Sequence, residues 1–333
     1  MRIWILHFFF QYLFDLSLPQ VSMQYYPAPE EVIELPTLIE AVRSAFIDHG
    51  TGHCQMPPKS YVFLPGGDFR TMPSYLPGLN VAGVKVVNVH PENRSRNLPT
   101  VMALTILLDP PTGKPIAILN ATGLTDLRTG ASAAVATAAL APVTKGTIGI
   151  IGAGKQARAG LRAIGEVFNI ESVKVWSRNI STAEHFAKEF SHLDVSVARI
   201  EQSADADVLL TTTPSTKPLI MNEWISDGTH INAIGADAPG KQELDPRILT
   251  RSRIFVDDRE QAYHSGEVNV PLRDGLLSPE NIAGTLGEVL TGRIDRGHQD
   301  KITVFDSTGI AITDLAVASL ALDKGRSINL PFS

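Results

Sequence analysis

The stretch TIGIIGAGKQARAG, residues 147–160, decides the fold because it joins a strand pattern to a glycine turn and a helix. Residues 147–151 are typical of a buried strand, and Gly152 and Gly154 follow at once. Gly152 permits a tight turn, Gly154 lets a ligand approach the backbone, and Ala157 keeps the helix close to the strand. The free N–H groups at the start of the helix attract phosphate. This order of elements predicts a dinucleotide-binding site.

The second half of the chain alternates between strand and helix patterns. Helical segments such as residues 156–168 and 182–190 separate several apolar runs. The runs cover residues 147–151, 173–176, 195–198, 208–213, 230–234 and 254–256. Short strands separated by helices favour a parallel, doubly wound sheet in an α/β fold. With the Ala-rich helical segment 125–140, they predict a Rossmann-type domain over residues 125–302.

The first 120 residues have a different pattern, with one helix and several strands joined by turns. Apolar residues recur at helical spacing over residues 36–49, and four strand patterns follow. The strand patterns cover residues 61–64, 81–89, 101–108 and 115–119. They predict an α+β domain with a mostly antiparallel sheet.

The end of the chain has a strand pattern at residues 302–305 and a helical one at residues 310–322. Both lie beyond the last run of the parallel sheet, so we expect them to return to the first domain. The expected architecture is a Rossmann-type sheet inserted into an α+β domain made of residues 23–124 and 303–333.

The composition excludes several classes of function. The 333 residues carry a net charge of −6 and no concentrated basic block, which argues against nucleic-acid binding. Cys54 is the only cysteine, so neither an internal disulfide nor a thiolate metal cluster can form. This cysteine usage favours a cytoplasmic protein.

The first 22 residues are treated apart from the fold. Their large apolar side chains resemble the core of a signal peptide, but His7, Gln11 and Asp15 interrupt them and no small-residue cleavage site follows. The run is too short to span a bilayer, so no membrane partner is expected. We predict that residues 1–22 are an extension that is not native, with a structured arm and a targeting segment as alternatives.

The end of the second strand indicates which dinucleotide binds. An NAD site normally has a carboxylate about 20 residues after its glycines, where it binds the ribose 2′-hydroxyl. Here Ser177 and Arg178 occupy that place, and Arg178 could pair with a 2′-phosphate. We therefore expect NADP(H) to be favoured and NAD(H) to remain possible, unless Arg178 is only a solvated charge. No metal site is expected, because His49, His53 and His90 lack the paired Cys/His spacing of a zinc site.

Several segments on both sides of the glycine turn together resemble one known family. They are QMPPK (55–59), GDFRTMP (67–73), LPTVMAL (98–104), LRTGA (127–131), INAIGAD (231–237), GKQELD (240–245) and FDSTG (305–309). On these segments the chain resembles the ornithine cyclodeaminase/mu-crystallin family, and within it the archaeal alanine dehydrogenase branch. The resemblance implies a homodimer formed through the first, substrate-binding domain.

Two residues match the catalytic positions of this family. Lys85 lies on the apolar run 83–87, where an ammonium is costly unless it has a partner or a task. Asp237 follows the run 230–234, at the end of a strand where parallel sheets bind ligands. The resemblance implies that both transfer protons. The structural alternatives are a lysine at a strand edge and an aspartate that caps a helix.

Other residues match binding positions of the family. Arg128 and Lys59 match positions that hold the substrate carboxylate, and Arg128 also lies near the cofactor phosphates in the family. Lys59 could instead be a surface lysine. For the cofactor the resemblance adds Thr100, Lys155, Gln156, Thr213, Lys241 and Ser307.

The resemblance implies an NAD(P)-dependent oxidoreductase that acts on the α-amino or α-imino carbon of a small amino acid. Alanine dehydrogenase is the first expectation, with L-alanine converted to pyruvate and ammonia. A ketimine reductase acting on Δ1-pyrroline-2-carboxylate or Δ1-piperideine-2-carboxylate is the alternative, because Ser177 and Arg178 depart from the NAD pattern of the alanine dehydrogenase branch. Ornithine cyclodeaminase and a non-enzymatic binding protein like mu-crystallin are further alternatives.

Overall fold

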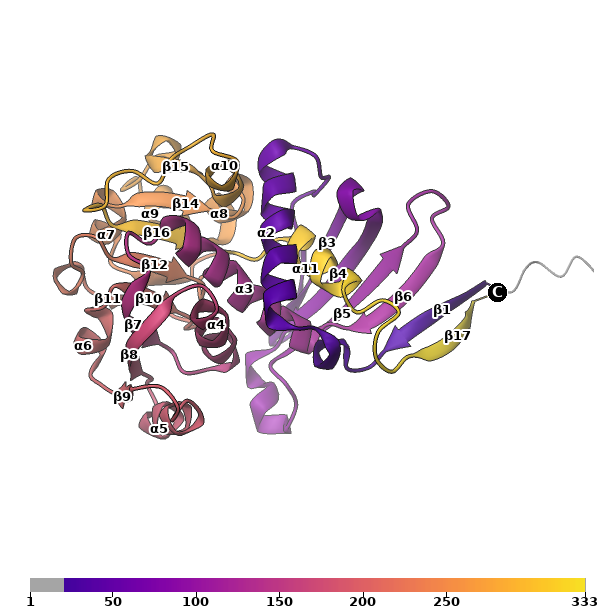
Figure 1. Ribbon diagram of the computed structural model, residues 1–333, viewed down its shortest axis with the longest axis horizontal. Helices are drawn as coiled ribbons and strands as arrows, with labels where there is room; N and C mark the ends of the chain where they lie inside the picture. Colours follow the sequence, from indigo (N-terminus) through magenta and orange to yellow (C-terminus); the bar gives the residue numbers. More distant parts are fainter. Residues whose placement is uncertain (1–20, 333) are drawn as a thin grey trace, which may run out of the picture.

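The computed structural model describes residues 21–332 and contains two large sheets with helices between them (Figure 1). The predicted N-terminal extension lies outside the described residues, except for Val21 and Ser22. These two residues begin strand β1 (Val21–Tyr26), and the origin of the extension stays a prediction. Among the described residues, no helix is long and apolar enough to cross a membrane.

The first sheet has seven strands in the order β17-β1-β6-β5-β4-β3-β2. Strands β2 to β6 are antiparallel neighbours, β1 runs parallel to β6, and β17 pairs antiparallel with β1. Their bounds are β2 (Ser60–Leu64), β3 (Gly67–Leu76), β4 (Val81–Val89), β5 (Val101–Leu108), β6 (Pro115–Asn120) and β17 (Ile328–Phe332). The prediction of a mostly antiparallel sheet is confirmed.

The second sheet has eight parallel strands in the order β15-β14-β16-β12-β10-β7-β8-β9. The bounds are β7 (Lys145–Ile151), β8 (Asn169–Trp176), β9 (Val195–Val197), β10 (Val208–Thr211), β12 (His230–Ala233), β14 (Arg253–Val256), β15 (Ile282–Thr285) and β16 (Thr303–Asp306). Its side chains alternate between two cores, with Ile148 in one and Leu209 in the other. The predicted doubly wound parallel sheet is confirmed.

Shorter elements connect the strands of the second sheet. The helices are α4 (Lys155–Gly165), α5 (Ile180–Glu189), α6 (Ile200–Ala204), α7 (Pro246–Arg251), α8 (Arg259–Ser265), α9 (Asn269–Arg273) and α10 (Leu286–Leu290). Strands β11 (Thr216–Ile220) and β13 (Gln242–Leu244) form a separate parallel pair.

One predicted boundary is wrong. Strand β16 was expected in the first domain, but it pairs with β12 and β14 in the middle of the parallel sheet. A strand pattern alone does not identify the neighbours of a strand. Strand β16 is the last strand of this sheet in the sequence, yet it lies in the middle of the sheet. The return to the first domain therefore begins after Asp306. The rest of the predicted domain division stays a prediction.

Three helices fill the space between the sheets: α2 (Leu35–Thr51), α3 (Thr122–Leu140) and α11 (Ala311–Ser319) (Figure 1). Helix α2 starts with a proline in its first turn and ends at Gly52, whose positive φ of 74° suits the helix terminus. Its buried side chains include Val42 and Phe46, and the Phe46 ring meets Phe305 of β16 edge to face. The three helices thus connect the two sheets through a continuous core.

Helix α2 and helix α10 contact each other through their backbones. Gly50 of α2 lies against Gly287 of α10, so closely that a Cβ on either residue would overlap backbone atoms of the other helix. A Cβ on Gly287 would lie 2.7 Å from the Gly50 nitrogen. The separation of α2 and α10, and with it the orientation of the two sheets, depends on this absence of side chains.

We predict that Gly287→Ala lowers the free energy of unfolding by about 1–3 kcal/mol, because α2 and α10 must move apart. Urea unfolding followed by circular dichroism measures the change. Gly165→Ala is the matched control, since a Cβ there would lie 3.4 Å from the Ile170 side chain and should cost little. Equal stability of the two variants would contradict the prediction.

Candidate active site

The predicted dinucleotide turn lies between β7 and α4, at the carboxyl edge of the parallel sheet. Gly152 has a φ of 97°, and a Cβ there would lie 3.0 Å from the Thr213 side chain. A Cβ on Gly154 would meet nothing within 4 Å, so space is open in front of the N-terminus of α4. The turn fits a dinucleotide phosphate, because a close approach to backbone and a helix N-terminus are both present.

Other residues predicted to bind the cofactor lie around this turn or near it in the chain. Gly152 donates its N–H to Trp176, the last residue of β8, so Ser177 and Arg178 follow directly beside the turn. Lys155 and Gln156 begin α4, where Lys155 is exposed. Thr100 precedes β5 and accepts a hydrogen bond from the His90 N–H at 2.8 Å. Within residues 21–332, no hydrogen bond or ion pair joins Thr100 to another predicted site residue.

Three cations come from one side of the first sheet. Lys59 immediately precedes β2, Arg70 lies on β3 and Lys85 lies on β4. Met72 pairs with Lys85 across the ladder and shares the face of Arg70, two residues away. Arg70 and Lys85 are 4% and 1% exposed. The site therefore contains buried positive charges that need partners or a function.

Asp237 forms ion pairs with two cations, Arg70 and Lys241. Its Oδ2 accepts a hydrogen bond from Arg70 Nη1 at 3.0 Å, and its Oδ1 is paired with Lys241. Arg70 also bonds Asp68 Oδ1 through Nε at 2.7 Å. Burial alone would raise the pKa of Asp237, but Lys241 and Arg70 hold this pKa below its usual range. Asp237 is thus an ionised carboxylate at neutral pH. Lys241, predicted as a cofactor contact, forms an ion pair with this carboxylate.

Lys85 and Arg128 share a single carboxylate. Asp314 Oδ1 accepts hydrogen bonds from Lys85 Nζ at 2.7 Å and from Arg128 Nε at 2.9 Å. Burial lowers the pKa of Lys85 to about 8, while Asp314 opposes this change and Arg128 adds to it. An ammonium with a pKa near neutral can both give and take a proton under physiological conditions.

Lys59 contacts the loop after β16. Its Nζ donates to the Thr308 carbonyl oxygen at 2.8 Å, and burial lowers its pKa to about 8. Asp257 binds the same loop through two hydrogen bonds. It accepts one from the Gly309 N–H at 2.7 Å and one from the Ser307 hydroxyl at 3.2 Å. Ser307 is thus buried beside the site and turned toward Asp257. Lys59 is only 9% exposed, so the alternative that it is a surface lysine is wrong.

Sequence reasoning missed Arg70, Asp314 and Asp257 as members of the site. The sequence contained a signal for Asp314. Its carboxylate lies in the apolar run 310–318 and, like Lys85 on its strand, is costly there unless it has a partner or a task. Arg70 lies in the family segment 67–73, but the sequence did not show that it would meet Asp237. Asp257 follows a buried strand, as Asp237 does.

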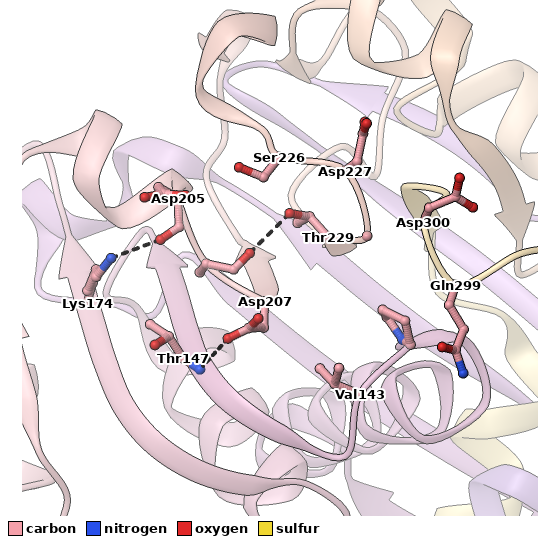
Figure 2. Close-up of a pocket in the computed structure, with 13 residues that line it drawn as sticks. Val143, Thr147, Lys174, Asp205, Asp207, Ser226, Asp227, Thr229, Gln299 and Asp300 are labelled. Atoms are coloured by element: carbon pink, nitrogen blue, oxygen red, sulfur yellow. Dashed lines mark hydrogen bonds between the residues drawn. The ribbon is translucent and has the colours of Figure 1, made fainter.

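A cavity of about 650 Å³ lies elsewhere, at the amino ends of the parallel strands (Figure 2). Its lining includes Asp205, Asp207 and Thr229, and Asp207 accepts the Thr147 N–H at 2.8 Å. None of the predicted site residues lines it. Within residues 21–332, no group of three or more His, Cys, Asp or Glu side chains could hold a metal ion.

Several known proteins resemble this chain in sequence and in fold. The alanine dehydrogenase of Archaeoglobus fulgidus is 46% identical over 90% of this chain and 94% of its own length. An archaeal alanine dehydrogenase dimer with bound NAD has a TM-score of 0.89 at 43% identity, covering 92% of this chain and 99% of its own. The Δ1-pyrroline-2-carboxylate reductase of Thermococcus litoralis, in complex with NADH and L-proline, has a TM-score of 0.87 at 34% identity, covering 90% and 97%.

These relatives confirm the predicted kinship with amino-acid dehydrogenases and imino-acid reductases. A profile of the ornithine cyclodeaminase/mu-crystallin family matches residues 22–329, nearly the whole described chain. The chain therefore belongs to the ornithine cyclodeaminase/mu-crystallin family.

Proposed function

We propose that the protein is an NAD(P)-dependent oxidoreductase that interconverts L-alanine with pyruvate and ammonia. The observation that carries the proposal is the meeting of Asp237 with Arg70 and Lys241 beside Lys59, Lys85 and Arg128, next to the dinucleotide turn. Guanidinium and ammonium groups can bind the substrate carboxylate. Holding it fixes the α-carbon in one orientation.

Five of the charged groups have a role in this proposal. A nicotinamide cofactor, held at the turn of Gly152 and Gly154, would supply or accept the hydride at the α-carbon. Asp237, ionised at neutral pH, takes a proton from the substrate nitrogen or from the attacking water. Lys85, whose pKa is about 8, exchanges a proton with the carbonyl oxygen. Lys59, Arg70 and Arg128 hold the carboxylate.

The runner-up is reduction of a cyclic imino acid such as Δ1-pyrroline-2-carboxylate. The same lysine and aspartate could protonate an imine nitrogen, and the Thermococcus litoralis reductase has a similar fold. An ornithine cyclodeaminase would release proline from ornithine without a net change in cofactor absorbance, and a non-enzymatic binding protein would have no need of the full set of charges.

The decisive experiment follows the absorbance of reduced nicotinamide with pyruvate plus ammonium and with Δ1-pyrroline-2-carboxylate. We expect turnover with pyruvate and ammonium, and expect Asp237→Asn to lower kcat by about 10²- to 10⁴-fold while cofactor binding is retained. Asp300→Asn, in the cavity at the opposite edge, is the matched control and should be as active as the wild type. Turnover with the cyclic imine alone would favour the runner-up, and no turnover with either would refute both.

The cofactor is proposed to be NADP(H). Arg178 is exposed in the loop after β8, and within the described residues no hydrogen bond or ion pair holds its guanidinium. Asn179 instead caps α5 by accepting the Ser181 N–H at 3.1 Å. No carboxylate in this loop would repel a 2′-phosphate. The archaeal alanine dehydrogenase structure holds NAD, but the cofactor of that relative does not determine whether this chain binds NAD(H) or NADP(H).

We expect the wild type to have a higher kcat/KM with NADPH than with NADH. Arg178→Ala should lower the value for NADPH by about 10- to 100-fold, because charge-assisted hydrogen bonds to the phosphate are lost, and should leave the NADH value nearly unchanged. Lys145→Ala removes an exposed charge at the opposite edge and serves as control. Equal losses with both cofactors would contradict an NADP site.

We also propose a homodimer, formed through the face of the first sheet that points away from the helices. On β5 the buried Ala103 and Thr105 alternate with Met102 and Leu104, which are 36% and 47% exposed. Val62 on β2 is also exposed. Exposed apolar sheet faces of this kind are typical of interfaces, and the archaeal alanine dehydrogenase is a dimer. A cytoplasmic location stays a prediction from the cysteine usage.

Light scattering should give the mass of a dimer for the wild type. Leu104→Lys should weaken dimerisation by about 100-fold or more, because it places a charge inside an apolar interface. Ile180→Lys, which changes an apolar residue of α5 that is 65% exposed, should leave the mass unchanged. A dimeric Leu104→Lys variant would place the interface elsewhere.

A further inference from the structure

Asp314 is a buried carboxylate that none of the roles above uses. It lies on α11, the helix that returns from the parallel sheet to cover β3 and β4 of the first sheet. Its Oδ1 is the acceptor for both Lys85 and Arg128, whereas its Oδ2 is buried without a hydrogen-bond partner among the described residues. One oxygen atom therefore fixes the position of two cations.

The contact with Arg128 also determines where its guanidinium points. Asp314 takes the Nε nitrogen, and within the described part of the chain no hydrogen bond reaches Nη1 or Nη2. Both Nη atoms lie against Gly309, because a Cβ there would be 2.5 Å from Nη1 and 2.8 Å from Nη2. Lys59 Nζ donates to the carbonyl oxygen of the neighbouring Thr308. The free part of the fork is thus turned toward the loop that Lys59 contacts.

We propose that Asp314 is the positioning residue of the active site, which orients Lys85 for proton transfer and turns the Arg128 fork toward the carboxylate of an amino-acid substrate. This proposal rests on the proposed function. Asp314 touches neither the substrate nor the reacting atoms in this role, and acts through its two partners.

The charges around Lys85 determine how its protonation should respond. Asp314 on α11 faces it with a negative charge, and Asp126 on α3 interacts with it more weakly. Arg128 on α3 and Lys59 before β2 face it with positive charges. On the flanking strands it meets uncharged groups, Met72 on β3 and Thr105 on β5. Removing the Asp314 charge leaves the cations in excess, so the neutral form of Lys85 becomes more stable.

The test is the pH dependence of kcat/KM for the Asp314→Asn variant. In the wild type we expect activity in the reductive direction to fall as pH rises through about 8, where Lys85 loses its proton. In Asp314→Asn this limb should move to lower pH by about one unit or more, and KM for the carboxylate substrate should rise about 10-fold. Ser319→Ala, in the last turn of the same helix, should leave the limb in place.

A second variant keeps the test decisive if Asp314→Asn does not fold. Arg128→Gln removes a cation, so its limb should move to higher pH even though its activity falls. A limb that stays in place in either folded variant, with only stability reduced, would give Asp314 a purely structural role and overturn the proposal. Wild-type protein without turnover on any amino or imino acid would instead refute the proposed function.

Discussion

The hydrogen bond between Arg70 and Asp237 joins the two sheets at the point where the chemistry is expected. Arg70 belongs to the antiparallel sheet, and Asp237 follows β12 of the parallel sheet. Arg70 would be costly in its buried position without an anion, and the half-buried Asp237 supplies one. The pair can form only if the two sheets keep one separation and one orientation, which the contact of Gly50 with Gly287 and the helices between the sheets maintain. The site therefore depends on the assembly of both domains.

The same division of charge recurs through the site. At two lysines a cation on or beside the first sheet meets an anion or a carbonyl oxygen from a segment that follows the parallel sheet. Lys59 meets the loop after β16, and Lys85 meets α11 beyond that loop. An incoming carboxylate would thus find cations held in place in advance. Such preorganisation favours the charged substrate without rearrangement of the protein during the reaction.

The sequence was sufficient for the parts of this protein that are encoded locally. The glycine turn at residues 152–154 required only neighbours in the chain, and so did the alternation of strands and helices. The sequence was insufficient where distant segments meet. Strand β16 reads as a strand, but its position between β12 and β14 follows from the packing of the whole sheet. Asp314 is 229 residues from Lys85, and no local pattern connects them.

The long-range contacts also explain why the loops at the ligand edge can be so well defined. Buried carboxylates hold them through backbone N–H groups: Glu243 accepts those of Thr213 and Gly235, and Asp257 accepts that of Gly309. Burial raises the pKa of Asp306 to about 8, so this neighbouring carboxyl is largely neutral at physiological pH. Ionised Asp257 and ionised Asp306 would repel each other, whereas a protonated Asp306 relieves that repulsion. These carboxyl groups fix the backbone beside the site, while Arg128, held by Asp314 through Nε, keeps Nη1 and Nη2 for the substrate carboxylate.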